Sequence, residues 1–456
     1  MQKAFYMRNV SMLVISVFAL TGTQAQWNTL CSGTSDNNGF IVDFEYFQDT
    51  LYATGLFTKI CGETVGHAAK WDGSNWYSVD IPHDGHAMEE IDGVLHFATY
   101  QFANDSNFVW RYYGDFVSAL GEGVFNEGGG TSYTPNLYDV IEYDGQIVAS
   151  GDFNRVGDKD ISGIMRWNGT EWDSLGGGLS GYLPGAPPIL YPHKMLVDGP
   201  DLWVCGNFSH AGGVEVNGIA GWNGTNWYSA GPGFDQAVYG IAVYDGSMWA
   251  GGQFTTSGAN EVASIARWNV SQWQSPGFGF ASADPFDFTY VHTLKVIDDM
   301  LFMAGGFDQV ILDDGTIIPC GSVVAWDGDS LYTFDGGVTD KDLEAIEKIP
   351  GGYLFGGGLY GQGYVAEWLP VDTSVAIHEI QQDIRVFPNP ATDVLYIQAS
   401  AGTQANYRIT DLTGKTVLCG YWNGQPVDVH NLTSGYYMLE LAADSGELLH
   451  SRLVVQ

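Results

Sequence analysis

The stretch "GIMRWNGTEWDSLGGG" (Gly163–Gly178) decides the fold, because variants of it recur along most of the chain. Its first tryptophan, Trp167, is followed at once by Asn-Gly, and its second, Trp172, stands six residues before Gly178. Asn-Gly readily adopts the positive φ angles of a two-residue hairpin turn. The stretch therefore predicts two antiparallel strands joined by a tight turn.

A longer unit surrounds this hairpin. A turn such as Tyr143–Gly145 precedes a strand with glycine and an aromatic residue at fixed offsets, as in Ile147–Phe153, and a variable loop leads to the tryptophan strand. The first tryptophan recurs at positions 71, 167, 222, 268, 326 and 368, with a degenerate copy at Trp110. Six steps of about 50 residues, with four strands per unit, indicate the blades of a β-propeller rather than a solenoid, which would need shorter repeats.

The two ends of this repeat region complement each other. The seventh unit stops at Trp368 without its fourth strand, whereas "QWNTLCSG" (Gln26–Gly33) is a fourth strand with no unit before it. We expect the N-terminal strand to complete the last blade, since closure leaves no open sheet edge between the first and last blades. The predicted fold class is all-β: a seven-bladed β-propeller closed by the N-terminal strand, followed by a small β-sandwich. Six or eight blades are the alternatives, because blade 2 is degenerate.

The first 25 residues resemble a secretory signal in their layout. Lys3 and Arg8 precede the apolar run Val10–Leu20, and small residues end at Ala25. The run is short for a bilayer span, so we interpret residues 1–25 as a signal peptide, with a membrane anchor as the alternative. We expect no later transmembrane segment.

The charge balance excludes some partners. The chain has 17 Lys and Arg against 53 Asp and Glu, a net charge of −36. Such a surface repels nucleic acid and suits a self-repelling extracellular monomer. The cysteine count of five is odd. We predict that Cys31 and Cys61 form a disulfide on the loop face of adjacent blades, with two separate thiols as the alternative.

The repeat wording, "GG-x-F … IA-x-WNG-x-x-W-x-x-L-G-x-G", resembles the kelch-like propeller repeats of secreted bacterial proteins and the propeller of fungal cortical polarity markers. The resemblance covers residues 26–370 and implies the propeller fold. It implies no particular activity, because propellers host many functions.

The repeat pattern ends before a linker at residues 371–383, and a different sequence pattern follows it. Residues 384–456 alternate polar and apolar positions between glycine-bearing turns and read as a small β-sandwich. This tail resembles the C-terminal sorting domain of the type IX secretion system of the Bacteroidetes; an ordinary adhesive β-sandwich is the alternative. The resemblance implies that the type IX secretion machinery is a partner and that the protein is secreted or attached to the outer-membrane surface. The matching residues are Pro388, Asn389, Pro390, Asp411, Gly414, Lys415, Gly435 and Tyr436.

The propeller predicts one set of converging residues. Nine positions before each second strand begins, counting back from Leu51, Leu95, Ile147, Leu202, Met248, Leu301 and Tyr353, stand Val42, His86, Tyr138, His193, Tyr239, His292 and Glu344. Equivalent positions of a ring meet at the axis, so we expect a polar, aromatic rim at the mouth of the channel. The rim is predicted to bind a ligand through His86, Tyr138, His193, Tyr239, His292 and Glu344. A rim that is merely hydrated, or one that holds a catalytic metal, are the alternatives; histidines two blades apart are expected to be too distant for one ion.

The long loops carry further aromatic residues, which suit a sugar or a protein partner or pack among themselves: Phe125, Tyr133, Tyr182, Tyr191, Phe280, Phe286, Phe288 and Tyr290. The sequence holds no zinc helix, nucleophile elbow or phosphate loop, and it identifies no cofactor. Two hypotheses remain. The favoured one is a noncatalytic binding module for glycan or protein. The other is an extracellular propeller enzyme, a metal oxidase or a carbohydrate-active enzyme, with its site at the channel mouth.

Overall fold

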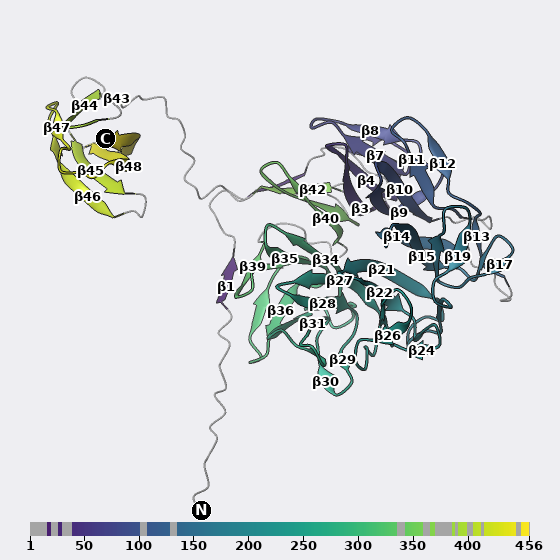
Figure 1. Ribbon diagram of the computed structural model, residues 1–456. Coiled ribbons are helices and arrows are strands. Elements are labelled where there is room, and N and C mark those ends of the chain that lie inside the picture. Colours follow the sequence, from purple (N-terminus) through teal and green to yellow (C-terminus); the bar gives the residue numbers. More distant parts are fainter. Residues whose placement is uncertain are drawn as a thin grey trace, which may run out of the picture. The chain divides into compact units, whose positions relative to one another are not determined.

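The computed structural model divides the chain into two compact units, Met1–Val371 and Asp372–Gln456 (Figure 1). The described residues are 16–19, 26–29, 39–100, 107–127, 135–334, 343–358, 365–369, 385–387, 391–398, 405–411, 415–443 and 448–455. Their regular secondary structure is β-strand. Within this part of the chain no helix has the length and apolar character needed to cross a membrane.

Seven sheets of the first unit share one plan, in which four strands pair antiparallel in the order first, second, third, fourth. Sheet 1 contains β3 (Phe40–Phe47), β4 (Thr50–Leu56), β7 (Ala68–Trp71) and β8 (Trp76–Val79). Sheet 2 contains β9 (Asp84–Ile91), β10 (Val94–Tyr100), β11 (Trp110–Tyr112) and β12 (Val117–Ala119). Sheet 3 contains β14 (Asn136–Tyr143), β15 (Gln146–Asp152), β18 (Ile164–Trp167) and β19 (Trp172–Ser174). Sheet 4 contains β21 (Tyr191–Asp198), β22 (Asp201–Asn207), β25 (Ile219–Trp222) and β26 (Trp227–Ser229).

The remaining three sheets follow the same plan. Sheet 5 contains β27 (Val238–Tyr244), β28 (Ser247–Gly252), β31 (Ile265–Trp268) and β32 (Trp273–Gln274). Sheet 6 contains β34 (Tyr290–Ile297), β35 (Met300–Gly306), β38 (Val323–Trp326) and β39 (Ser330–Thr333), and β1 (Ser16–Ala19) lies parallel to β39. Sheet 7 contains β40 (Leu343–Ile349), β41 (Gly352–Gly357), β42 (Val365–Leu369) and, from the N-terminal region, β2 (Gln26–Thr29).

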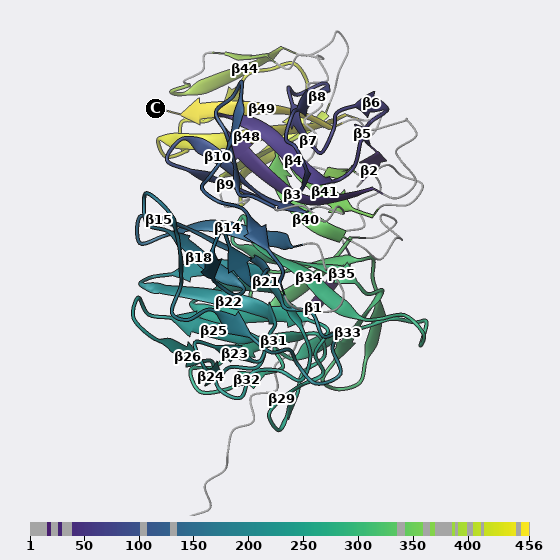
Figure 2. The ribbon, with the colours of Figure 1, turned by 90° about the vertical axis from the view of Figure 1, so that its right-hand side faces the viewer.

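The first strands line up beside one another, which makes the unit propeller-like. Each of β3, β9, β14, β21, β27 and β34 contacts the first strand of the following sheet, and β40 contacts β3. Figure 2 shows β3, β9 and β40 side by side. β2 pairs antiparallel with β42, with Trp27 opposite Trp368.

The tryptophans of the repeat hold neighbouring sheets together. Within a sheet the two tryptophans stand opposite each other, as Trp167 does with Trp172. In sheets 3, 4 and 5 the buried second tryptophan also donates from its indole Nε1 to a backbone oxygen of the segment that follows the preceding sheet, as Trp172 does to Leu120 at 2.9 Å and Trp273 to Ala230 at 3.0 Å. The hydrophobic cores accordingly lie between sheets, with residues of two neighbouring sheets in each.

The register of sheet 2 corrects the assignment of its degenerate tryptophan. Leu95 stands opposite Tyr112, as Leu51 stands opposite Trp71 in sheet 1. Tyr112 is therefore the counterpart of the first tryptophan, and Trp110 lies two residues earlier, on the same side of the strand.

The loops between second and third strands are more regular than the sequence indicated. Three of them form a hairpin that is joined by a strand from the segment before the same sheet: β16 (Arg155–Val156) and β17 (Lys159–Asp160) with β13 (Val124–Phe125), β23 (His210–Ala211) and β24 (Val214–Glu215) with β20 (Leu179–Ser180), and β36 (Gln309–Leu312) and β37 (Ile317–Pro319) with β33 (Phe278–Ala281). Two others are plain hairpins, β5 (Lys59–Ile60) with β6 (Glu63–Thr64) and β29 (Thr256–Ser257) with β30 (Asn260–Glu261).

The second unit contains two antiparallel sheets around one core, which agrees with a small β-sandwich. One sheet holds β43 (Arg385–Phe387), β44 (Val394–Gln398) and β47 (Val427–Asp428); the other holds β46 (Thr416–Trp422), β45 (Ala405–Asp411), β48 (Gly435–Ala443) and β49 (Leu448–Val455) in that order. Leu395 of the first sheet is buried with Ile409 and Leu439 of the second. Of the motif residues, Asp411 ends β45, Lys415 precedes β46, and Gly435 and Tyr436 begin β48, whereas Pro388, Asn389, Pro390 and Gly414 lie outside the described residues.

Candidate ligand site at the meeting point of the first strands

A register shift interrupts the pairing of every first strand with its second strand. In β3 the shift falls between Ile41 and Asp43, so Val42 has no partner across the ladder. The residues skipped in this way are Val42, His86, Tyr138, His193, Tyr239, His292 and Glu344. They are the seven positions reached by counting along the repeat. A β-bulge of this kind turns its extra residue out of the normal alternation.

All seven bulged residues line a single cavity of about 450 Å³. Five of the predicted site residues form a connected set of rings inside it. The ring centroid of His193 lies 4.6 Å from that of His292 and 5.8 Å from that of His86, and His86 lies 5.0 Å from Tyr138, all edge to face. Tyr239 lies 5.5 Å from His193. The structure therefore brings the predicted rim together.

The alternation of histidine and tyrosine has a hydrogen-bonding reason. His86 Nδ1 lies 3.1 Å from the backbone oxygen of Tyr138, and His193 Nδ1 lies 2.5 Å from that of Tyr239. A carbonyl oxygen only accepts, so each Nδ1 must carry the hydrogen and each Nε2 is left as an acceptor. His193 is 6% exposed, and its Nε2 is buried without a partner among the described residues. It therefore offers an acceptor to a ligand.

His292 departs from this arrangement because the backbone oxygen of Glu344, the bulged residue of the next sheet, accepts from another donor. The Thr293 hydroxyl donates to the backbone oxygen of Glu344, and His292 Nδ1 is buried without a partner in the described part of the chain. Burial lowers the pKa of His292 to about 3 and that of His86 to about 4, and it lowers the pKa of His193 well below the ordinary value. The three imidazoles are neutral at pH 7.

A belt of charged side chains follows one and three residues further along the same strands. Lys194 Nζ lies 3.0 Å from Asp139 Oδ1 of the preceding sheet, and Asp139 Oδ2 accepts the backbone N–H of Met195 at 2.6 Å. Asp43 likewise accepts the N–H of Met88 at 2.8 Å, and Lys295 pairs with Glu347. Because each contact joins two neighbouring sheets, the belt fixes their first strands to one another.

Two glutamates of this belt titrate near neutral pH. Burial, followed by the charge of Asp43, raises the pKa of Glu45 to about 8, and burial raises the pKa of Glu89 to about 7. Burial also raises the pKa of Asp43 and Asp139. Protonated carboxyls in a cavity can donate as well as accept hydrogen bonds, and they are also the groups that general acid or base catalysis requires.

Sequence reasoning placed two residues of this site among the loop aromatics. Tyr191 begins β21, and its ring centroid lies 4.2 Å from that of Tyr138; Tyr290 begins β34, 6.0 Å from Tyr239. Both stand two positions before a bulged histidine. This constant spacing from a bulged histidine was the signal that could have identified them, although the bulge breaks the alternation of the strand between the two residues.

The other loop aromatics lie apart from the cavity lining. Phe286 is 91% and Phe288 74% exposed, Tyr182 and Phe125 are also exposed, and Phe280 is buried in the core between sheets 5 and 6. Tyr133 lies outside the described residues. The interpretation of these loops as one aromatic binding surface therefore holds for only some of its members.

Two further expectations concern metal and disulfide. The histidines of alternate sheets were expected to be too far apart for one ion, yet their rings are in contact; among the described residues no group of three His, Cys, Asp or Glu is arranged to hold a metal. Cys61 is disulfide-bonded, whereas Cys31 lies outside the described residues, so their pairing stays a prediction.

Comparison with known proteins gives one family match. Residues 385–456 match the secretion system C-terminal sorting domain (Por secretion tail). An endo-acting ulvan lyase of Formosa agariphila is 29% identical over 93 residues, which are 20% of this chain and 17% of that protein. The chain thus spans about a sixth of the length of this relative.

Solved structures resemble the chain at low sequence identity. The extracellular domain assigned to the hybrid two-component system BT4673 of B. thetaiotaomicron is 12% identical with a TM-score of 0.46, over 95% of this chain and 59% of that one. PorZ, a surface component of the type IX secretion system of Porphyromonas gingivalis, is 13% identical with a TM-score of 0.31, over 93% and 70%. The family match at the C-terminus confirms the predicted localisation: the chain carries a type IX sorting tail and is exported to the cell surface or the extracellular space.

Proposed function

We propose that the first unit is a noncatalytic seven-bladed propeller, closed by β2, that binds a glycan in the cavity where its first strands meet. The observation that carries the proposal is the bulge in every first strand, because it directs seven equivalent side chains into one cavity. The pairing of β2 with β42 and the contact of β40 with β3 support ring closure.

The chemistry of the cavity suits a sugar. Sugar rings combine apolar C–H faces, which pack on aromatic rings, with hydroxyls that donate and accept hydrogen bonds. Tyr138 and Tyr239 line the cavity and supply the rings, and Tyr191 packs against both. The Nε2 of His193 supplies an acceptor, and Lys194 with its paired Asp139 supplies charged partners. A cavity of about 450 Å³ lies within the range of about 300–1,000 Å³ that small ligands occupy.

The test compares the secreted chain with its His86→Ala, His193→Ala, His292→Ala triple variant. A glycan array identifies ligands of the unaltered protein, and calorimetry measures their affinity for both proteins. We expect the triple variant to lose at least about tenfold in affinity, since three acceptors disappear from the cavity. His210→Ala, on the loop hairpin β23–β24, is the matched control and should bind normally. An unchanged affinity in a folded triple variant would contradict the proposed site, and failure to bind any glycan would contradict the ligand class.

A carbohydrate-active enzyme is the second candidate. Glu45 and Glu89 favour it, because carboxyls with a pKa near neutrality can act as general acids or bases, and so does the local similarity to an ulvan lyase. A glycan that binds is incubated with the protein and analysed for new chain ends. Cleavage that Glu89→Gln abolishes while affinity is kept would establish the enzyme; an intact glycan supports the binding module.

A further inference from the structure

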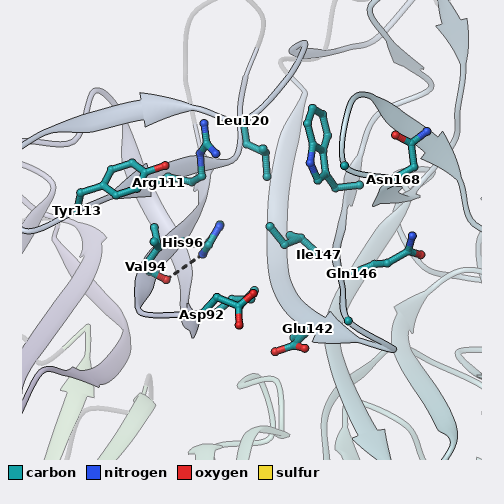
Figure 3. A pocket seen from close by; sticks show the side chains of 14 residues that line it. Asp92, Val94, His96, Arg111, Tyr113, Leu120, Glu142, Gln146, Ile147 and Asn168 are labelled. Carbon is teal, nitrogen blue, oxygen red and sulfur yellow. Dashed lines mark hydrogen bonds between the residues drawn. The ribbon is translucent and has the colours of Figure 1, made fainter.

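A second cavity, of about 330 Å³, lies between sheets 2 and 3 at the end that carries the tight turns of the sheets (Figure 3). Its walls come from both sheets: His96 and Arg111 from sheet 2, and Glu142, Gln146 and Trp167 from sheet 3. None of its lining residues also lines the cavity at the meeting point of the first strands. It is therefore a separate place in the fold.

The repeat explains why there is space here. By register, His96 stands opposite Arg111 as Trp249 stands opposite Arg267 and Phe302 opposite Ala325. At this position the other six sheets carry apolar or aromatic side chains: Tyr52, Val148, Trp203, Trp249, Phe302 and Leu354. Those of sheets 5 and 6 are packed in the core against the following sheet. Among the seven sheets, only sheet 2 carries a histidine at this position, where the other six carry an apolar or aromatic side chain.

The histidine is held ready to accept a hydrogen bond. His96 is 3% exposed, and its Nδ1 lies 3.0 Å from the backbone oxygen of Val94, so Nδ1 carries the hydrogen. Its Nε2 is buried without a partner among the described residues. Figure 3 shows the imidazole pointing from Val94 into the space between the sheets. A buried polar atom left unpaired is unfavourable, and a ligand donor would supply the missing hydrogen bond.

Arg111 adds a second buried and unpartnered polar atom. Its Nε has no hydrogen-bond partner in the described part of the chain, while its terminal nitrogen donates to Ser118 Oγ at 3.2 Å. The cavity therefore contains one buried donor and one buried acceptor, and both come from neighbouring strands of sheet 2.

The charges around the cavity select for a neutral ligand. The carboxylates of Asp92 and Glu142 lie exposed at its edge and repel an anion, whereas the guanidinium of Arg111 repels a cation. The amide of Gln146 adds a donor and an acceptor, whereas that of Asn168 is bonded within its own turn, and the rings of Tyr113 and Trp167 offer aromatic faces. A small neutral molecule with several hydroxyls satisfies all of these groups.

We propose that the cavity between sheets 2 and 3 binds a single neutral sugar ring, with His96 Nε2 accepting from one of its hydroxyls and Arg111 Nε donating to one of its oxygens. The volume, at the lower end of the usual range for ligand sites, admits one ring rather than a chain. This site goes beyond the proposed function because it would act independently of the cavity at the bulges.

The experiment uses the full secreted chain and three probes, D-glucose, D-galactose and D-mannose. Affinity is measured by calorimetry, and the imidazole nitrogens of ¹⁵N-histidine-labelled protein are followed by NMR. We expect at least one sugar to bind and to shift the Nε2 resonance that His96→Phe removes. His96→Phe, which installs the apolar side chain of sheet 6, should weaken binding at least about tenfold. Tyr52→Phe, at the equivalent position of sheet 1, is the matched control and should bind normally.

Each outcome decides the proposal. If none of the three sugars binds, or if His96→Phe binds as well as the unaltered chain, the proposal is wrong. Arg111→Lys, which removes the Nε donor, covers the case in which His96→Phe does not fold, and it should also weaken binding. The His86→Ala, His193→Ala, His292→Ala variant should keep this affinity, so that a failure here and a failure of the proposed function remain distinguishable.

Discussion

The backbone of the following sheet fixes the protonation of the imidazoles at the bulges. His86 and His193 donate from Nδ1 to the carbonyls of Tyr138 and Tyr239, and burial keeps both rings neutral. The cavity therefore presents acceptors over a wide range of pH, unlike exposed histidines, which gain a proton near pH 6.5.

This neutrality predicts the pH dependence of ligand affinity. The pKa of His86 is about 4 and that of His292 about 3, so neither gains a proton between pH 6.5 and 5. Glu45, with a pKa of about 8, and Glu89, with a pKa of about 7, line the same cavity, so the measurement uses the Glu45→Gln, Glu89→Gln variant. We expect its ligand affinity, measured by calorimetry, to stay level across that interval and to fall only as pH approaches 4. A decline centred on pH 6.5 would show that the histidines are accessible to solvent. Because these pKa values lie below those of the unfolded chain, their contribution to stability is present above pH 6.5 and is lost as pH falls through 4 and 3.

The contribution of Glu45 to stability has the opposite pH dependence. Its pKa is raised from 4.5 to about 8, so the folded protein keeps a proton that the unfolded chain releases. Stability from this group is present below pH 4.5 and is lost as pH rises through 8. Glu45→Gln should therefore flatten the decline of the unfolding free energy between pH 5 and 8 by up to about 1.4 kcal/mol per pH unit. Denaturant titrations at several pH values measure it; equal slopes for both proteins would contradict the assignment.

At the scale of strands and sheets, the second tryptophan of sheets 3, 4 and 5 acts as a bridge. Trp273 is fully buried, and its indole bonds to Ala230 outside its own sheet, whereas its partner Trp268 is only partly buried. Trp273→Phe leaves that carbonyl unpaired and creates a void, so we expect a loss of about 2–4 kcal/mol in unfolding free energy. Trp268→Phe is the control and should cost less than half as much. Chemical denaturation of both variants decides this, and equal losses would refute the bridging role.

The repeat accounts for how far this architecture could be predicted. Counting along the units found every bulged residue, because equivalent positions share one backbone geometry. The bulge itself left no mark in the sequence, since residues as different as Val42, His193 and Glu344 occupy it. Where one unit departs from the others the counting failed, as at Trp110 and Tyr112. His96 was overlooked because a histidine within a strand does not by itself indicate a site. Its position becomes informative only when the register aligns it with Trp249 and Phe302.

At the scale of the whole molecule, the disulfide of Cys61 concerns how the N-terminal region is held. Cys205 and Cys419 are free thiols, and Cys31 follows β2 by two residues. We predict that peptide mapping without reductant will recover Cys31 linked to Cys61. Cys61→Ser should then lower stability by about 2–4 kcal/mol, since the bond closes a long loop. Cys419→Ser, at an exposed site, should change little, and identical peptide maps with and without reductant would exclude the bond.

The sorting tail makes a prediction about the route of export. Residues 385–456 form a separate compact unit with its own core, so their removal leaves the first unit's core intact. Deleting Val386–Gln456 should trap a folded first unit in the periplasm, as detected by fractionation and limited proteolysis. The truncated protein in the medium at normal levels would show that export does not depend on the tail.

The bulges separate the shape of the site from its chemistry. In each sheet the residues on both sides of the skipped one are paired, and aliphatic, aromatic, imidazole and carboxyl side chains all occur at the skipped position. The backbone frame therefore accepts different side chains there, although His86 and His193 also bond to the next sheet. A library built at these positions would sample new recognition specificities in much the way that antibody loops do, but on a rigid frame with little conformational entropy to lose on binding. The cavity is in that sense a rigid binding frame in which the seven bulged side chains can be exchanged.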